Sequence, residues 1–243
     1  MEKKRQIAAV LILLALIGVI AYRHSTGKDL EKYEASFFDV FDTQTQIIGY
    51  ASSKGQFSEQ MSLIKDKFQY YNDLYDIYHD YEGMNNIKTI NDNAGIQPVK
   101  VDEEIIELLK LGITMDEKTD GNMNIAMGSV LSIWHDYREA GSEDPGSAEL
   151  PPMDELERAA EHTDIHNIVI DEEESTVYLT DPDMSLDVGS IGKGYAVQKV
   201  AEYAKNELGI QYMLFSVGGN VCAIGGHPDG SAWAVGIQNP DVE

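Results

Sequence analysis

A glycine-rich segment in the last third of the chain constrains the fold most strongly. Residues 186–196 read Leu-Asp-Val-Gly-Ser-Ile-Gly-Lys-Gly-Tyr-Ala, and apolar residues then recur at helical spacing as far as Leu208, before Gly209. The N-terminus of a helix offers unpaired N–H groups and the positive end of its dipole, and glycines let a ligand approach the backbone. The segment therefore predicts either a phosphate-binding loop or a tight turn from a strand into a helix.

The glycine spacing differs from that of a Walker A loop. Walker A has four residues between its first glycine and the Gly-Lys pair, which Ser or Thr then follows. Here Gly189 and the Gly192-Lys193 pair enclose two residues, and Gly194 stands in place of the hydroxyl residue. The segment is therefore not a nucleotide-binding P-loop.

The charge balance limits the possible partners. The chain has 18 Lys+Arg against 42 Asp+Glu, a formal net charge of −24. A field of this sign repels phosphate backbones, so we expect no sequence-independent nucleic-acid binding. A phosphate-bearing ligand would need a metal ion or aimed backbone N–H groups. The single cysteine, Cys222, excludes an intramolecular disulfide and a multi-cysteine metal site within the chain.

The N-terminus has the pattern of an export signal. Lys3, Lys4 and Arg5 precede an uninterrupted apolar run over residues 7–22, which a polar stretch then follows. This order is typical of a signal peptide or signal anchor over residues 1–28. Because no clear small-x-small cleavage site follows the run, we expect an uncleaved anchor. Its basic end would be cytoplasmic, and residues 29–243 would lie outside the bacterial cell membrane.

The rest of the chain mixes helical and strand patterns. We expect strands over residues 37–50, 213–217, 221–224 and 233–237, a β-hairpin over 168–179, helices over 58–78, 102–118, 154–160 and 195–208, and loops over 85–95 and 140–152. The order lacks the regular strand–helix alternation of a doubly wound sheet. It predicts an α+β fold with largely antiparallel sheets.

Two further segments carry polar residues that packing does not explain. Asn122 and Asn124 flank Met123 directly after a glycine, which suits either hydrogen bonds to a flat heterocycle or a turn after a helix. Residues 216–221 read Ser-Val-Gly-Gly-Asn-Val, and hairpin turn chemistry is one explanation for the two glycines.

Taken together, these segments resemble the ApbE family of FAD:protein FMN transferases. The matching motifs are Phe-Asp-Thr at 41–43, Thr-Asp-Gly-x-x-Asn-Ile-Ala-x-Gly from 119, Leu-Asp-x-Gly-Ser-Ile-Gly-Lys-Gly-Tyr-Ala from 186, Ser-Val-Gly-Gly-Asn-Val from 216, and Trp-Ala-Val-Gly-Ile-Gln-Asn-Pro from 233. They occur in the family's order and cover about residues 37–240. The resemblance implies a T-fold-like α+β architecture and an exported or membrane-attached bacterial enzyme.

The resemblance also implies an activity. Members of the family use Mg²⁺ to transfer FMN from FAD to a threonine hydroxyl of an acceptor protein, with release of AMP. The acceptors are subunits of sodium-pumping and Rnf-type redox complexes. Two alternatives stay open: an Mg²⁺-dependent FAD pyrophosphatase that needs no acceptor, and a non-catalytic exported FAD-binding protein.

Individual residues match the family's functional positions. The positions that match FAD contacts are Phe41, Tyr78, Asn122, Met123, Asn124, Asp187 and Lys193, and Ser190 matches a metal-proximal hydroxyl. For Tyr78 a place in the core at the end of the predicted helix is the alternative. Asn124 departs from the family, which has a carboxylate there, and Phe41 replaces the methionine that precedes Gly-Thr in many relatives.

The family's sequences continue beyond the point that matches Glu243. We therefore expect residues 29–243 to be the N-terminal part of an ApbE-like domain. A fragment of a longer gene product is the favoured explanation, and a truncated, inactive form is the alternative. The family's catalytic histidine and most of its Mg²⁺ ligands would then lie in the remaining part. None of the six histidines here has the context of that histidine, so the sequence assigns no catalytic residue.

Overall fold

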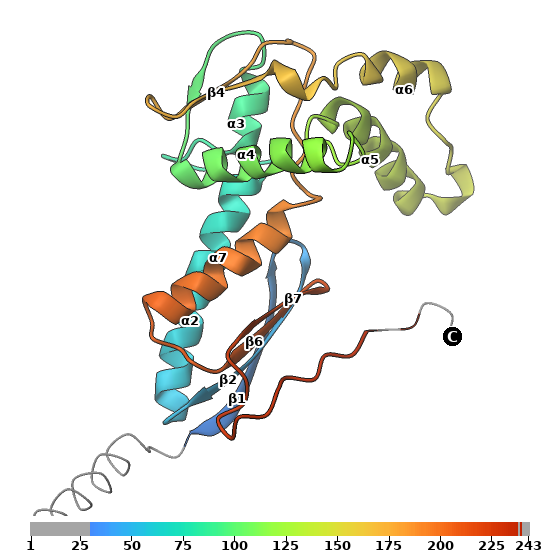
Figure 1. The fold of residues 1–243 in the computed structure, drawn as a ribbon. Helices are drawn as coiled ribbons and strands as arrows, with labels where there is room; N and C mark the ends of the chain where they lie inside the picture. Colours follow the sequence, from blue (N-terminus) through green and yellow to red (C-terminus); the bar gives the residue numbers. More distant parts are fainter. Residues whose placement is uncertain (1–29, 238, 240–243) are drawn as a thin grey trace, which may run out of the picture.

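The computed structural model describes residues 30–237 and 239, which form an α+β fold with two antiparallel sheets (Figure 1). The predicted fold class is confirmed. The four-stranded sheet contains β1 (Glu31–Val40), β2 (Thr43–Ala51), β6 (Met213–Val217) and β7 (Asn220–Ile224) in that order. The three-stranded sheet has the order β3 (Val99–Lys100), β5 (Thr176–Leu179) and β4 (Ile168–Asp171). The predicted signal anchor at residues 1–28 lies outside the described part of the chain.

Helices connect and cover these sheets. They are α2 (Lys54–Tyr75), α3 (Ile87–Asp92), α4 (Glu103–Lys118), α5 (Gly128–Glu143), α6 (Met153–Ala160) and α7 (Gly192–Asn206), with 3₁₀ turns at Pro145–Ser147 and Ile165–Asn167. Within the described ranges, no helix is both long enough and apolar enough to cross a membrane.

The prediction of one strand over residues 37–50 is wrong, because a two-residue turn divides the segment into β1 and β2. Phe41 has φ +54° and Asp42 has φ +48°, and Val40 pairs with Thr43 on either side of them. Such a turn usually contains Asn-Gly or Asp-Gly, since both residues are left-handed. A non-glycine residue in this region costs about 1–3 kcal/mol, so the turn is strained.

Helix α2 packs along one face of the four-stranded sheet (Figure 1). Ile47 in β2 and Phe68 in α2 are fully buried. The ring of Phe68 lies 6.2 Å from that of Phe215 in β6, at 66°. Burial of side chains of this size contributes about 1.5–3 kcal/mol each. The helix ends at Tyr75, so Tyr78 lies in the segment after it and not on the predicted helix over 58–78.

Residues 85–95 contain a short helix where we expected a loop. Asn86 begins α3 with a capping box, in which its side chain accepts a hydrogen bond from Thr89 N and the Thr89 hydroxyl accepts one from Asn86 N. The buried Asn86 amide also donates to Asp73 O at 3.1 Å and His79 O at 2.8 Å. Asparagine therefore begins a helix here and fixes the chain that leaves α2.

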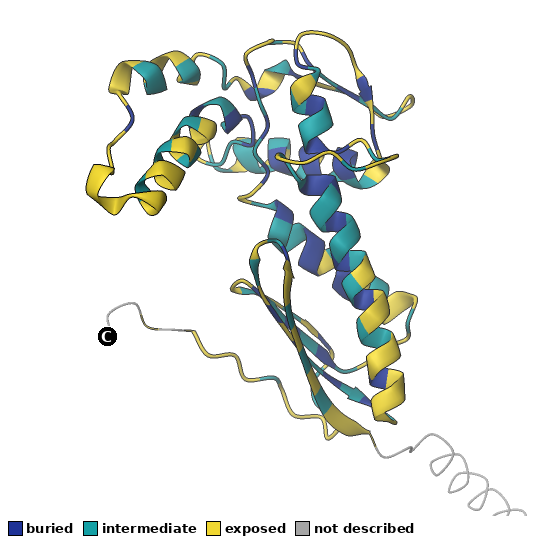
Figure 2. Cartoon of the chain, turned by 180° about the vertical axis from the view of Figure 1, so that it is seen from behind, coloured by how far each residue is buried: buried dark blue, intermediate teal, exposed yellow. Residues whose placement is uncertain are grey.

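Most of the other expected elements are confirmed, including the helices over 102–118, 154–160 and 195–208, the hairpin, and the strands over 213–217 and 221–224. The last of these helices begins slightly earlier, at Gly192. Helix α5 extends to Glu143 into the predicted loop over 140–152. Figure 2 shows α5 and α6 as mostly exposed or half-buried, whereas buried residues concentrate on the helices that cover the core. The predicted strand over 233–237 is wrong, because no described strand pairs with these residues.

Candidate functional site

A cavity of about 460 Å³ lies where the N-terminus of α7 meets the end of α2 and the β1–β2 turn. Four of the residues predicted to contact FAD line it, namely Phe41, Tyr78, Asp187 and Lys193. They come from three segments that are far apart in the sequence. The fold therefore brings half of the sequence-predicted site residues to one place.

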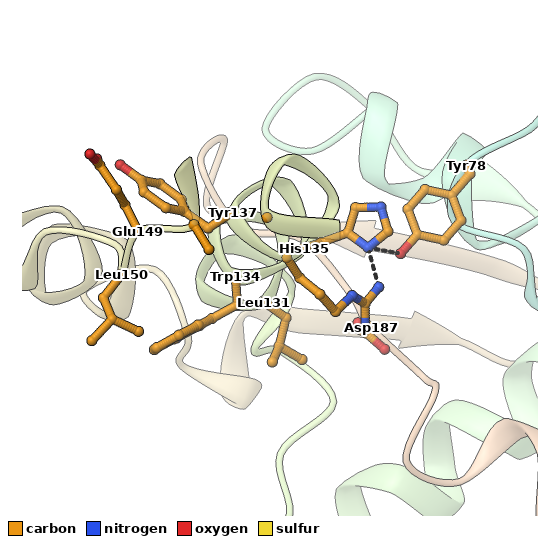
Figure 3. A pocket seen from close by; sticks show the side chains of 11 residues that line it. Tyr78, Leu131, Trp134, His135, Tyr137, Glu149, Leu150 and Asp187 are labelled. Carbon is orange, nitrogen blue, oxygen red and sulfur yellow. Dashed lines mark hydrogen bonds between the residues drawn. The ribbon is translucent and has the colours of Figure 1, made fainter. Parts of the chain in front are cut away.

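A second cavity of about 550 Å³ adjoins the first, and Tyr78 and Asp187 line both. Its other wall is α5, which contributes Trp134, His135 and Arg138 (Figure 3). The two cavities thus meet at Tyr78 and Asp187. The second has aromatic residues of α5 in its wall, and the first has the N-terminus of α7.

The start of α7 offers a positive environment. No side chain caps the helix at Ile191, and Lys193 lies in its first turn. Within the described chain, the Lys193 ammonium forms no hydrogen bond or ion pair. Helix N-termini with free N–H groups bind anions, and an adjacent ammonium adds to this attraction. The cavity is also lined by Asp39, Asp42, Asp76 and Asp187. A phosphate held there would therefore need a cation to offset these carboxylates.

Asp187 closes the loop that leads into α7. Its N–H donates to Ile125 O at 2.9 Å, and its Oδ1 accepts a hydrogen bond from Gly189 N at 2.8 Å. A Cβ on Gly189 would lie 3.0 Å from the same carboxylate oxygen, which is tighter than ordinary contacts. The carboxylate and the glycine thus form a compact turn beside the cavity, and a side chain at position 189 would push the Asp187 carboxylate from its place.

Tyr78 is 53% exposed, and its ring lies against His135 with centroids 5.0 Å apart and planes at 30° (Figure 3). Its hydroxyl is 3.4 Å from His135 Nδ1. Partial burial and the nearby Asp187 carboxylate raise the pKa of Tyr78 above its ordinary value, so the phenol stays protonated at neutral pH.

Asp76 organises the segment that carries Tyr78. Its carboxylate accepts hydrogen bonds from Tyr78 N at 2.6 Å, from the Tyr81 hydroxyl at 2.7 Å and from His79 Nδ1 at 2.9 Å. Burial alone would raise the pKa of Asp76, but these hydrogen bonds outweigh it and hold the pKa below its usual value. The ionised carboxylate therefore fixes residues 76–81 at the cavity wall.

His135 is held by two neighbours on its own helix. Arg138 Nη2 lies 2.7 Å from His135 Nδ1, and Glu139 Oε1 lies 3.0 Å from Nε2. Because an arginine can only donate, Nδ1 accepts, and we assign the proton to Nε2, which donates to Glu139. These two contacts fix the orientation of the ring against Tyr78.

Asn122, Met123 and Asn124 line neither cavity. The Asn122 amide donates to Thr119 O at 2.6 Å and Met123 packs against the core. The Asn124 side chain donates to Thr163 O and accepts from Ala126 N at 2.7 Å. All three thus have structural roles here, and their predicted contacts with FAD stay predictions.

Ser190 is exposed in the turn before α7, and its hydroxyl has no hydrogen-bond partner among the described residues. Mg²⁺ prefers six oxygen ligands, several of which are usually waters or substrate phosphates. One hydroxyl thus fits one position of such a site and does not build it alone. In the described part of the chain, a three-residue His/Asp group suited to a metal occurs only at His162, Asp181 and Asp183, which do not line the cavities.

His162 and Asp181 form an ion pair, with Nδ1 2.9 Å from Oδ2. The hydrogen bond between them raises the pKa of His162 and lowers that of Asp181. Because each charge stabilises the other, these residues can lie close together without a bound metal ion.

Sequence reasoning missed several residues that line the two cavities. Asn72 comes from α2, and Trp134, His135 and Arg138 come from α5. The last three occur at spacings of one and three residues within a helix, but nothing in the sequence pairs α5 with Tyr78. Only the spacing of Trp134 and Arg138, four apart on one helical face, offered a local signal.

Known proteins that are similar to this chain belong to the same family that the motifs indicate. The sequence model of the ApbE family matches residues 41–243. The FAD:protein FMN transferase of Escherichia coli (strain K12) is 25% identical over 193 residues, which cover 78% of this chain and 53% of that protein. The FAD:protein FMN transferase of Treponema pallidum (strain Nichols) is 29% identical over 167 residues, which cover 63% and 44%. The chain spans about half the length of the curated relatives it matches.

Solved structures share the fold. The flavin transferase ApbE from Vibrio cholerae has a TM-score of 0.72 at 20% identity, covering 87% of this chain and 65% of that one. The ApbE protein from Thermotoga maritima has a TM-score of 0.72 at 25% identity, with the same coverage of 87% and 65%. The motifs, the fold and the family match agree, and the chain belongs to the ApbE family.

Proposed function

We propose that the protein transfers FMN from FAD to a threonine hydroxyl of an acceptor protein, in an Mg²⁺-dependent reaction that releases AMP. The observation that carries this proposal is the cavity at the start of α7, which gathers Phe41, Tyr78, Asp187 and Lys193. Relatives of this chain carry the name FAD:protein FMN transferase, which supports the same chemistry.

The residues at the cavity fit FAD. The uncapped N-terminus of α7 and the Lys193 ammonium would hold the pyrophosphate, which carries the ligand's negative charge. Tyr78 presents an aromatic face on which a flat ring system can stack. The neighbouring cavity, which shares Tyr78 and Asp187 in its lining, gives a long ligand further room beside this ring.

The reaction exchanges one phosphorus–oxygen bond for another. The threonine oxygen bonds to the FMN phosphorus, the pyrophosphate bond to the AMP phosphate breaks, and the threonine proton passes to a base. In this chain, α7 and Lys193 would orient the pyrophosphate and stabilise its charge. Ser190 would supply one oxygen to Mg²⁺, which when bound neutralises phosphate charge.

The cellular setting is part of the proposal. The basic residues and the apolar run within residues 1–28 support a membrane anchor, with the site outside the bacterial cytoplasm. An acceptor would then be an exported or membrane-bound redox subunit, such as one of an Rnf-type or sodium-pumping complex.

The test incubates the 243-residue chain, alone or extended by the C-terminal part that its relatives have, with FAD, Mg²⁺ and an acceptor domain that carries the target threonine. The mass of the acceptor is then measured. We expect a gain of one FMN group with the extended chain, because the family's catalytic histidine would lie in that part, and none when valine replaces the target threonine. Release of free FMN and AMP without modification would instead support the pyrophosphatase. FAD that binds and remains intact would support a non-catalytic binding protein.

A further inference from the structure

The β1–β2 turn is held in an unfavourable shape at the wall of the cavity. Phe41 and Asp42 both have left-handed backbones, with φ +54° and +48°, and neither is a glycine. Both residues line the cavity at the start of α7. A strained conformation of this kind persists only where surrounding groups hold it.

Asn72 supplies the group that holds the turn. Its Oδ1 accepts a hydrogen bond of 2.7 Å from the backbone N–H of Phe41, across 31 positions of the sequence. No other partner of this N–H occurs among the described residues. Asn72 also lines the same cavity, so the turn and the residue that holds it face the same space.

The orientation of the Asn72 amide is itself fixed. Its Nδ2 donates to Asp73 Oδ1 at 3.2 Å, and the Gln69 amide donates to the same oxygen at 2.7 Å. A carboxylate can only accept, so the NH₂ group of Asn72 points to Asp73 and its carbonyl oxygen points to Phe41. Gln69, Asn72 and Asp73 on α2 thus form a chain of hydrogen bonds that directs the carbonyl oxygen of Asn72 to the turn.

We propose that Asn72 is a positioning residue, which holds the Phe41–Asp42 turn in the shape that lets Phe41 contact the bound flavin nucleotide. This inference rests on the proposed function, because FAD is the ligand that it names. Without the acceptor at Asn72, the turn relaxes toward right-handed backbone angles and Phe41 leaves its place at the cavity wall.

The test compares Asn72→Leu, Asp42→Gly and the double variant with the unchanged chain. Leucine has a similar volume but no acceptor, whereas glycine at position 42 adopts a positive φ without strain. FAD affinity is measured by quenching of flavin fluorescence, and hydrogen exchange of the Phe41 amide is measured without ligand. Gln198→Leu is the matched control, since it removes a 2.8 Å amide hydrogen bond to Glu202 on α7 away from the cavity.

We expect Asn72→Leu to weaken FAD binding at least tenfold and to accelerate exchange at Phe41, while the melting temperature stays close to that of the control. Asp42→Gly should reduce the effect of Asn72→Leu severalfold, because an unstrained turn needs less support. Equal FAD affinity in Asn72→Leu and the unchanged chain would overturn the positioning role alone. A parent chain that binds no FAD would overturn the proposed function and this inference with it.

Discussion

The imidazole of His135 lies against the phenol ring of Tyr78, with the ring planes inclined by 30°. Arg138 and Glu139, which lie on α5 with His135, hold the imidazole in place. Tyr78 therefore has an ordered neighbour although half of the surface of Tyr78 is exposed. This stack holds an aromatic ring that lines both cavities before any ligand binds. Binding to a surface that is already ordered costs less conformational entropy.

The ring of Tyr78 should contribute to FAD binding more than its hydroxyl does. Aromatic stacking is worth about 0.5–1.5 kcal/mol, so Tyr78→Leu should weaken FAD binding by up to roughly tenfold. Tyr78→Phe keeps the ring and should bind FAD with nearly unchanged affinity. Flavin fluorescence titration measures both, and equal losses in the two variants would contradict a stacking role.

Lys193 should bind FAD through its charge. Hydrogen bonds to charged groups contribute about 1.5–3 kcal/mol, so Lys193→Gln should raise the Kd for FAD by roughly 10- to 100-fold. With added salt, the affinity of the parent chain for FAD should also fall more steeply than that of the Lys193→Gln variant. Lys205→Gln in the last turn of the same helix is the control, and an equal loss there would indicate a general field instead of a contact.

Gly128 should tolerate no side chain. A Cβ at this position would lie 2.6 Å from the backbone oxygen of Ser185, which cannot move as a flexible side chain can. Gly128→Ala should therefore lower the free energy of unfolding by about 1–3 kcal/mol. Gly55→Ala, in open space in the first turn of α2, should be neutral or stabilise by up to about 1 kcal/mol. Urea unfolding of both variants checks the contrast.

The ion pair between His162 and Asp181 should make stability depend on pH. Their hydrogen bond raises the pKa of His162 above 6.5 and lowers that of Asp181 below 3.8. The His162 contribution is complete below pH 6.5 and is lost as the pH rises through the higher pKa of the folded protein. The Asp181 contribution is complete above pH 3.8 and is lost as the pH falls through the lower folded pKa.

The melting temperature should therefore differ most between the parent chain and His162→Gln at pH values between about 4 and 6.5. The difference should shrink above and below this window, and Asp181→Asn should show the same profile. A difference that is constant with pH would mean that the charges do not interact in the folded state.

Periodicity and turn composition predicted the helices α2, α4, α6 and α7 and the glycine-bounded strands β6 and β7, but not helix α5. They failed at Phe41 and Asp42, because a strained turn without glycine looks like continuous strand. They failed again at Asn86, whose loop composition conceals a capping box. In both places contacts made in the folded protein override local preference.

The candidate site could be predicted only in part, since motifs identify residues but not their neighbours. Phe41, Tyr78, Asp187 and Lys193 were expected from the resemblance, and the structure gathers them at one cavity. Asn72 and His135 lie on ordinary amphipathic helices, where polar residues face solvent by default. Only tertiary packing turns these residues toward the turn and toward Tyr78.

The first part of helix α2 packs on the four-stranded sheet, and near its C-terminal end the Asp73 carbonyl accepts a hydrogen bond from Asn86 at the start of α3 (Figure 1). Unfolding of either the four-stranded sheet or α3 would expose a face of α2 to water. The sheet and the α3 region should therefore unfold as a single cooperative unit. Calorimetry should therefore show one heat-absorption peak with equal calorimetric and van't Hoff enthalpies. The slowest-exchanging amides should include those of α2, and the cavity should persist up to the temperature at which the whole domain unfolds.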